Sequence, residues 1–179
     1  SKIWLSSPHM GGNEQKYVKE AFNSNWVAPL GPNVDGFEKD LESYLNQDSH
    51  VACLSSGTAA LHLALILAGV NSEDEVICQS MTFSASANPI VYLGAKPIFI
   101  DSEIETWNMC PIFLEEAIKD RISKGKKPKA IIVVHLYGNL VDIDPIRNIN
   151  SDILIIEDSA QAHGAINNNG IKAGNLGNA

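Results

Sequence analysis

The sequence predicts an α/β fold in which a mostly parallel sheet is flanked by helices. Short runs rich in Val and Ile alternate along the chain with longer stretches of helical periodicity. Alternation at this spacing requires right-handed crossovers, which place helices on both faces of a parallel sheet. The chain has 179 residues, of which 45% are hydrophobic and 19% charged, so it can bury a sizeable core.

Each element is predicted from its own pattern. The expected strands are apolar runs that end at polar or small residues: 50–54, 75–79, 96–101, 130–135 and 153–157. The helical stretches between them are 58–69, 84–93, 111–123 and 142–148. Two further helices precede the first strand. The helix at 13–25 begins with Asn13 as its cap and Glu14 in its first turn, and the helix at 34–46 follows a Pro/Gly-rich loop at 26–32.

Charge and cysteine content exclude several classes of function. The net charge is −8, which does not suit non-specific nucleic-acid binding or an anionic membrane surface. The basic cluster at 124–129 is expected to be a solvated loop. Cys53, Cys78 and Cys110 form no CxxC pair, so neither a disulfide framework nor a metal site is expected, and Cys53 and Cys78 are read as core residues. No signal peptide is expected, and the apolar helix at 59–70 is too short to cross a bilayer, so a cytoplasmic protein is predicted.

The end of the last predicted strand carries the most informative residues. Glu157 and Asp158 follow an apolar run at the point where a parallel strand leaves its sheet, which is where ligands of open α/β sheets bind. Asp158 can hold a protonated ring nitrogen, and Gln161 can reach a neighbouring ring oxygen, as a pyridoxal phosphate site requires. The alternative is a polar strand end with a capped turn.

A second candidate is the Ser55-Ser-Gly-Thr58 segment, which lies between a predicted strand and a predicted helix. Free backbone N–H groups and the positive helix end would form a phosphate site, to which the Ser56 and Thr58 hydroxyls can add while Gly57 permits close approach. The alternative is an ordinary helix cap. GxGxxG and Walker motifs are absent from the sequence.

Three other strand ends carry candidate residues. Phe83 could lie flat against an aromatic ring, although a core position is an alternative. Asp101 could contact the edge of a cofactor, although a cap on the following turn is favoured. His135 could take part in proton transfer or could be a hydrogen-bonded wall residue. Because carboxyl ends of parallel strands meet at one edge, these residues together favour a single site.

These motifs together resemble the DegT/DnrJ/EryC1/StrS family of pyridoxal phosphate-dependent nucleotide-sugar aminotransferases, of aspartate-aminotransferase-like fold (fold type I). The resemblance extends through nearly the whole chain, as the following segments share the family's motifs: PHMGGNE at 8–14, NWVAPLG at 25–31, FE at 37–38, SSGTAAL at 55–61, MTF at 81–83, GAKP at 94–97, FID at 99–101, HLYG at 135–138 and EDSAQAHG at 157–164. PHMGGNE and APLG look most like bacterial enzymes that aminate a UDP-linked 4-keto-6-deoxy-N-acetylhexosamine, as in bacillosamine synthesis.

The resemblance implies roles for individual residues. Asp158 matches the partner of the pyridinium nitrogen, and Gln161 matches the residue that contacts the 3′ oxygen. Phe83 matches the aromatic residue that stacks on the ring. Gly57 and Thr58 match the phosphate loop.

Further implications concern the substrate and the chain's organisation. Residues 1–33 would form an N-terminal segment with a helix and a substrate-side loop, in which Trp26 could contact the nucleotide sugar. His135 is the second residue expected to contact the substrate. Residues 34–179 would form the cofactor-binding large domain, without its C-terminal part and the small domain. The implied reaction transfers an amino group from glutamate to the C4 ketone of a nucleotide sugar in surface glycan or glycoprotein sugar biosynthesis, in a homodimer.

The chain departs from the family's pattern near its last residues. The family's Schiff-base lysine follows a Gly-x-x-Gly-Asp stretch, whose counterpart here is Gly174-Asn-Leu-Gly-Asn178, with Asn178 in place of Asp. Lys172 precedes this stretch and does not match the lysine. We therefore expect residues 1–179 alone to lack transaminase activity. Alternatives are a sugar 3-dehydratase of the same family, in which histidine replaces the lysine, and a non-catalytic binding protein.

Overall fold

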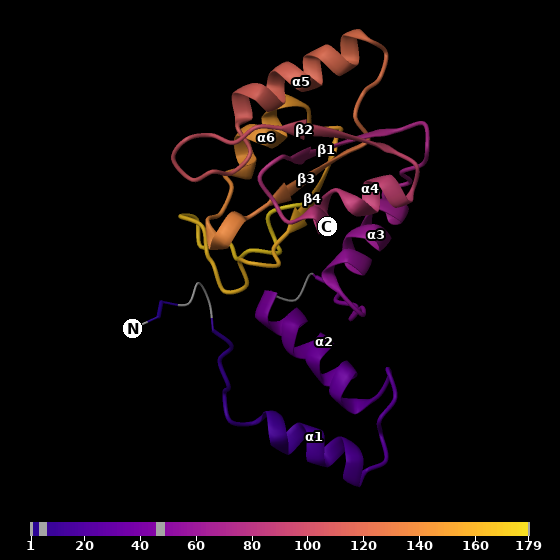
Figure 1. Cartoon of the computed structure of the whole chain (residues 1–179), viewed down its shortest axis with the longest axis vertical. Helices are drawn as coiled ribbons and strands as arrows, with labels where there is room; N and C mark the ends of the chain where they lie inside the picture. Colours follow the sequence, from indigo (N-terminus) through magenta and orange to yellow (C-terminus); the bar gives the residue numbers. More distant parts are fainter. Residues whose placement is uncertain (1, 4–6, 46–48, 179) are drawn as a thin grey trace. The chain divides into compact units, whose positions relative to one another are not determined.

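The computed structural model describes residues 2–3, 7–45 and 49–178, and the chain forms two compact units, Ser1–Cys53 and Leu54–Ala179 (Figure 1). The sequence placed the boundary between residues 33 and 34. In the structure the second helix belongs to the N-terminal unit, so the division comes later in the chain.

The N-terminal unit contains two helices, α1 (Glu14–Asn23) and α2 (Pro32–Leu45). Both predicted helices are confirmed with shifted ends, and position 46 lies outside the described residues. The prediction that Asn13 caps α1 with its side chain is wrong, because its backbone is already helical and its side chain makes no cap bond. The Glu14 carboxylate instead accepts the backbone N–H groups of Gly11 and Gly12.

The predicted strand at 50–54 is wrong: these residues are irregular. The N–H groups of Val51 and Cys53 donate to the carboxylates of Glu42 and Glu38 in α2, at 3.0 and 2.7 Å, instead of entering a ladder. Cys53 is accordingly exposed and not a core residue, whereas Cys78 is buried as expected.

The C-terminal unit is built on a four-stranded parallel sheet in the order β2-β1-β3-β4. The strands are β1 (Glu75–Gln79), β2 (Lys96–Ile100), β3 (Ala130–Val134) and β4 (Leu154–Asp158). The helices are α3 (Gly57–Leu67), α4 (Asn88–Tyr92), α5 (Pro111–Ser123) and α6 (Ile143–Ile149), with short 3-10 turns η1 (Ser84–Ser86) and η2 (Leu136–Gly138). The predicted α/β class and parallel sheet are confirmed.

The predicted helix at 84–93 is divided into η1 and α4. Pro89 lies in the first turn of α4, where its missing N–H costs nothing and its fixed φ favours the start of a helix. A new helix therefore begins at Asn88 rather than continuing from Ser84.

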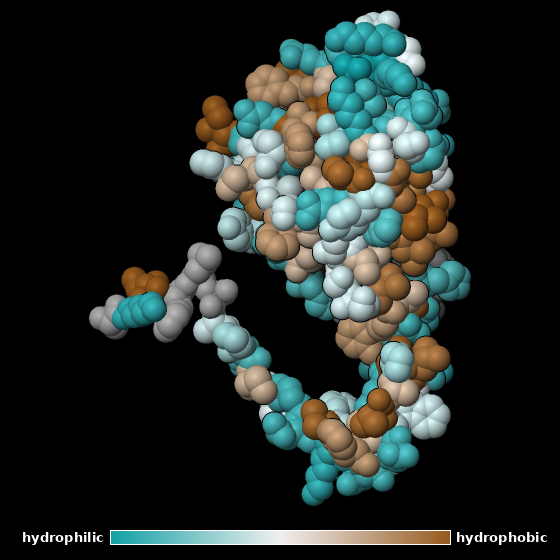
Figure 2. Space-filling model, turned by 45° about the vertical axis from the view of Figure 1, so that its right-hand side comes forward, coloured by the Kyte–Doolittle hydropathy of each residue, from teal (hydrophilic) through white to brown (hydrophobic). Residues whose placement is uncertain are grey.

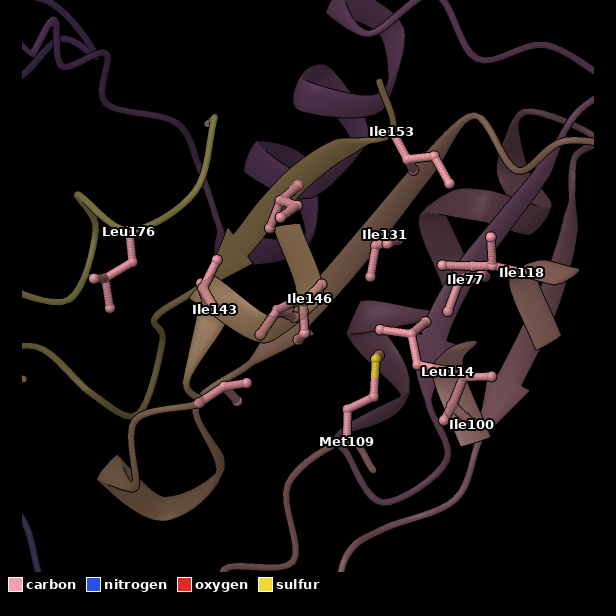
Figure 3. Close-up of a cluster of buried hydrophobic side chains, with 13 residues drawn as sticks. Ile77, Ile100, Met109, Leu114, Ile118, Ile131, Ile143, Ile146, Ile153 and Leu176 are labelled. Carbon is pink, nitrogen blue, oxygen red and sulfur yellow. The ribbon is translucent and has the colours of Figure 1, made fainter. Parts of the chain in front are cut away.

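Side chains alternate between two cores, one on each face of the sheet. Ile131 and Val133 of β3 join the core beneath α5 and α6, together with Leu114 and Ile146 (Figure 3). The intervening Ile132 points to the opposite core, which α3 and α4 cover. Burial on both faces explains why β3 reads as a continuous apolar run and why the centre of β1, residues 76–78, is apolar.

The strand order reverses direction between β1 and β3. From β1 the chain crosses to β2 on one side, and the next strand, β3, lies on the other side of β1. At such a point the crossover helices leave on opposite faces, and a crevice opens beyond the carboxyl ends of the strands. Within the described residues, no helix is both long and apolar enough to cross a membrane.

Candidate active site

A cavity of about 230 Å³ opens at the carboxyl ends of the strands, on the side of the sheet where the order reverses. It is lined by the first turn of α3, the segment after β1 and the ends of β3 and β4. The lining residues are Gly57, Thr58, Leu61, Thr82, Phe83, Ala85, Val134, Asp158, Ala160 and Gln161. Five of the residues predicted from the sequence therefore surround one cavity: Gly57, Thr58, Phe83, Asp158 and Gln161.

The first turn of α3 forms one wall. Ser56 is the N-cap: its backbone is extended and its Oγ accepts the N–H of Ala59 at 3.1 Å. Gly57 and Thr58 line the cavity, and a Cβ added at Gly57 would stand in open space. The first N–H groups of a helix have no partner within the helix, so this wall offers donors and the positive end of the dipole to an anion.

Asp158 is the acidic residue of the cavity wall, and both of its oxygens accept hydrogen bonds. The hydroxyl of Ser86 lies 2.9 Å from Oδ2, and the N–H of Ala160 lies 3.2 Å from Oδ1. The Oγ1 of Thr82 lies 2.9 Å from the Oγ of Ser86. The carboxylate is therefore held from two sides while it lines the cavity.

The side chain of Gln161 is oriented by the backbone of η2. Its Oε1 accepts the N–H of Tyr137 at 2.8 Å. Tyr137 has φ 51°, an uncommon conformation for a residue with a side chain, and Gly138 follows with φ 88°. Because the amide oxygen of Gln161 is occupied, its NH₂ group is the end available to donate to a ligand oxygen.

Phe83 is a large aromatic residue with 75% of its surface exposed, and it lines the cavity. Phe83 is the N-cap residue of η1, and its backbone is extended. An aromatic ring that is exposed beside a cavity, rather than buried in either core, offers a flat surface on which a planar ligand can stack.

His135 lies in the protein interior, and its side chain is not exposed. Its Nδ1 accepts the N–H of Val141 at 3.0 Å, and its Nε2 lies 2.8 Å from Oε1 of Glu157. The sequence had left open proton transfer or a hydrogen-bonded wall position, and this arrangement favours the wall position. Contact of His135 with substrate stays a prediction.

Glu157, noted in the sequence only as the neighbour of Asp158, accepts five hydrogen bonds. Besides His135, its donors are the hydroxyl of Ser159 and the backbone N–H groups of Gly174, Leu176 and Gly177, at 2.6 to 3.0 Å. Burial would raise the pKa of Glu157, but the hydrogen bonds from His135 and the three backbone groups outweigh it and lower the pKa to about 2.

The segment that departs from the family's pattern is thus attached to β4. Besides its contacts with Glu157, the backbone N–H of Asn178 donates to the carbonyl of Ile155 at 2.7 Å. The Asn178 Oδ1 accepts the N–H of Ile155 at 2.9 Å. An aspartate oxygen could accept the same bond, so Asn178 preserves the contact that the family's usual residue could make there.

Two residues that shape the site were missed by sequence reasoning. Gln79 is fully buried at the end of β1, and it donates to the Met81 carbonyl and accepts the N–H of Val134. A polar residue ending an apolar strand was the available signal. Ser86 supports Asp158 from 72 residues away, and no local pattern marks it.

Within the C-terminal unit, three predicted residues are not among those that line this cavity: Ser56, Asp101 and His135. The carboxylate of Asp101 accepts the N–H of Ser102 at 2.8 Å, which fits the expected turn cap. Trp26 belongs to the N-terminal unit, where its indole N–H donates to the Leu30 carbonyl, and its contact with substrate stays a prediction. Across the described ranges, no group of His, Cys, Asp and Glu side chains is arranged to hold a metal ion.

A parallel α/β sheet with a site at the point of strand reversal defines the class of protein as an α/β enzyme scaffold. The chain belongs to the DegT/DnrJ/EryC1/StrS aminotransferase family, whose model matches residues 8–179.

Relatives of known name agree with this assignment. The chain is 49% identical over 167 residues to EpsN of Bacillus subtilis (strain 168), assigned as a pyridoxal phosphate-dependent aminotransferase; the match covers 92% of the chain and 43% of EpsN. It is 40% identical over 178 residues to a GDP-perosamine synthase of Caulobacter vibrioides, covering 98% of the chain and 46% of that enzyme. The chain therefore spans less than half the length of these relatives.

Solved structures share the fold. Spr1654 of Streptococcus pneumoniae, assigned as a sugar aminotransferase and solved in its PMP form, superposes with a TM-score of 0.87 at 31% identity, covering 98% of this chain and 46% of that one. A GDP-4-keto-6-deoxymannose-3-dehydratase, solved with pyridoxal phosphate and glutamate trapped together, gives 0.87 at 27% identity, covering 98% of this chain and 45% of that one. The predicted fold type I large domain is confirmed by these superpositions.

Proposed function

We propose that the protein carrying this sequence is a pyridoxal phosphate-dependent aminotransferase. It would move an amino group from glutamate to the C4 ketone of a nucleotide-linked 4-keto-6-deoxy sugar, for surface glycan or glycoprotein sugar biosynthesis. The observation that carries the proposal is the cavity itself, where the N-terminus of α3 and the Asp158 and Gln161 side chains line one space.

The residues of the cavity fit the cofactor group by group. The N–H groups at Gly57 and Thr58 suit a phosphate, and the open space in front of Gly57 permits its close approach. The Asp158 carboxylate suits a protonated ring nitrogen, and the NH₂ of Gln161 suits the 3′ oxygen. When bound, the cofactor supplies an electron sink for breaking and forming bonds at the amine-bearing carbon.

The chain's own residues would bind and orient this group. Phe83 offers a stacking surface against one face of the ring. Asp158, held from two sides, would keep the ring nitrogen protonated, because a fixed negative charge favours the neighbouring cation. Gln161, held by the Tyr137 N–H, would donate to the ring oxygen without turning its carbonyl toward it.

The named relatives support a nucleotide-sugar substrate. By its name, GDP-perosamine synthase makes a GDP-linked sugar, and the dehydratase structure was solved with glutamate. The PHMGGNE and APLG segments support the finer proposal of a UDP-linked 4-keto-6-deoxy-N-acetylhexosamine, as in bacillosamine synthesis. Trp26 is proposed to contact the nucleotide sugar.

A second candidate function is sugar 3-dehydration. The superposition on the 3-dehydratase favours it, since that enzyme shares the fold over 98% of this chain. In this family a lysine at the position after the 174–178 stretch goes with amine transfer, and a histidine goes with dehydration. A non-catalytic role would require that the position carry neither.

The remaining proposals concern assembly and location. The exposed faces of α3 and α4 carry Ile66, Leu67, Val91 and Tyr92, and Figure 2 shows hydrophobic residues gathered on the side where these helices lie. Exposed apolar surface of this kind supports a protein partner, which we propose is a second copy of the chain in a homodimer. The three free cysteines suit a reducing cytoplasm.

The proposal is tested with the intact protein that contains this sequence. Purified protein with pyridoxal phosphate and glutamate would be incubated separately with UDP-, GDP- and dTDP-linked 4-keto-6-deoxy sugars. The products would be identified by mass spectrometry. An amino sugar with matching formation of 2-oxoglutarate is expected, and it should be lost in Asp158→Asn. A product that has lost the C3 hydroxyl and keeps its ketone would indicate dehydration. Absence of any product from all three sugars would contradict both amine transfer and dehydration. Residues 1–179 alone are expected to give no turnover.

A further inference from the structure

We propose that Ser86 is a positioning residue for Asp158, and that Thr82 and Ser86 form a directed hydrogen-bond relay fixing the carboxylate that faces the cavity. The inference rests on the proposed function, because it concerns the group that Asp158 would hold. Its members come from two segments: Thr82 and Ser86 follow β1, and Asp158 ends β4.

The chemistry of the three side chains sets the direction of the relay. An ionised carboxylate can only accept, so the hydroxyl of Ser86 must donate to Oδ2 of Asp158 across 2.9 Å. A serine hydroxyl has one proton, which this bond uses. The 2.9 Å contact between Thr82 and Ser86 must therefore be donated by Thr82. The relay runs from Thr82 to Ser86 to Asp158.

Burial makes the relay a fixed feature. Ser86 is 1% exposed, so water cannot replace its bond to Asp158. The second carboxylate oxygen accepts the N–H of Ala160 at 3.2 Å, so rotation about the Cβ–Cγ bond would break hydrogen bonds on both sides. The remaining lone pairs of Asp158 thus keep constant directions.

The relay also decides what Thr82 presents to a ligand. Thr82 lines the cavity, but its proton is committed to Ser86. Only the lone pairs of the Thr82 hydroxyl remain available to a ligand. Thr82 can therefore accept a hydrogen bond from the ligand but cannot donate one while Asp158 is ionised. A ring nitrogen bound here would meet an acceptor-only surface, which favours its protonated form.

The test uses the intact protein, with Ser86→Ala, Thr82→Val and Thr82→Ser variants. Pyridoxamine phosphate labelled with ¹⁵N in its ring would be titrated to obtain the Kd, and the ¹⁵N chemical shift would report ring protonation. We expect Ser86→Ala to weaken binding by about tenfold or more and to move the shift toward the unprotonated form. Thr82→Val should weaken it by about two- to tenfold, and Thr82→Ser should behave as wild type.

A double variant separates relay from direct contact. If Thr82 acts through Ser86, Thr82→Val adds nothing in the Ser86→Ala background, whereas direct contact of Thr82 with the ligand gives an additive loss. Additivity would overturn the relay, as would wild-type affinity and shift in Ser86→Ala. If Ser86→Ala fails to fold, as judged by near-UV circular dichroism, Thr82→Val decides: unchanged affinity and shift overturn the proposal.

Failure of the relay is distinguishable from failure of the proposed function. Wild-type protein that does not bind pyridoxamine phosphate, or an Asp158→Asn variant that binds it with unchanged affinity and shift, contradicts the function itself. Wild-type binding that depends on Asp158 but not on Ser86 contradicts only the relay.

Discussion

The Nε2 atom of His135 lies 2.8 Å from Oε1 of Glu157, and neither side chain is more than 1% exposed. This pair joins the end of β3 to β4, and its members are the chain neighbours of Val134 and Asp158, which line the candidate site. Because Glu157 also accepts the backbone N–H groups of residues 174, 176 and 177, the pair ties the last described segment to the sheet.

Glu157→Gln should destabilise the protein most at neutral pH. The pKa of Glu157 is lowered to about 2 in the folded protein from an ordinary value of 4.5, so its contribution to stability is complete above pH 4.5 and is lost as the pH falls toward 2. A shift of this size corresponds to a contribution on the order of 3 kcal/mol. Urea unfolding at pH 7 and at pH 3 measures the difference in free energy of unfolding between wild type and variant.

In Glu157→Gln the new side-chain NH₂ group would also face backbone N–H donors. This donor–donor contact lowers the free energy of unfolding at pH 7 further. Glu115→Gln, at an exposed position of α5, is the control that should change stability little at either pH. A difference between wild type and Glu157→Gln that is as large at pH 3 as at pH 7 would contradict an ionised Glu157.

His135 should be neutral with its proton on Nε2. The Val141 N–H donates to Nδ1, so that atom must be an acceptor, and only Nε2 can carry the proton that the Glu157 contact requires. Long-range ¹H–¹⁵N spectra of histidine-labelled protein at pH 7, assigned with His135→Gln, measure the tautomer. A proton on Nδ1 would show that the Val141 bond is wrong.

Gly57→Ala should separate cofactor binding from stability. The new Cβ meets no atom within 4 Å, and alanine is the better helix residue, so the free energy of unfolding should stay unchanged or rise by about 0.5–1 kcal/mol. The methyl would occupy space beside the cavity, and the Kd for pyridoxamine phosphate should increase by about tenfold or more.

Gly36→Ala is the matched control, because its Cβ also meets nothing within 4 Å in helix α2. It should raise stability similarly and leave the Kd unchanged. Equal Kd values for the two variants would place the phosphate away from Gly57.

Gln79→Leu should cost about 2–4 kcal/mol of stability. The substitution keeps the size of the side chain but leaves the buried Val134 N–H and the partly buried Met81 carbonyl without their present partner. Thermal or urea unfolding measures the loss, with Gln15→Leu on exposed α1 as the control. An undiminished stability would show that these two groups find other partners.

The sheet could be predicted because its strands are recognisable from local pattern. Residues 130–134 are apolar, four of the five are β-branched, and the structure buries all of them. The segment 50–54 has a similar apolar pattern but is not a strand, because Glu38 and Glu42 take its N–H groups. That competition comes from a preceding helix, so no reading of 50–54 itself could reveal it.

The site was predictable to the extent that parallel strands end at a common edge. Phe83, Asp158 and Gln161 lie around one cavity for this reason. Gly57 lines the same cavity from the first turn of α3, although the segment 50–54 before it is not a strand. The supporting residues were not predictable: Ser86 reaches Asp158 across 72 positions, and Tyr137 orients Gln161 through its backbone, where the side chain leaves no pattern.

The most direct test is a crystal structure of the intact protein grown with pyridoxamine phosphate. We predict that the phosphate lies at the N-terminus of α3 by Gly57 and Thr58, with the ring against Phe83. The ring nitrogen should lie within hydrogen-bonding distance of Asp158, and the 3′ oxygen within that distance of Gln161. A molecule bound elsewhere, with this cavity filled only by water, would contradict the account.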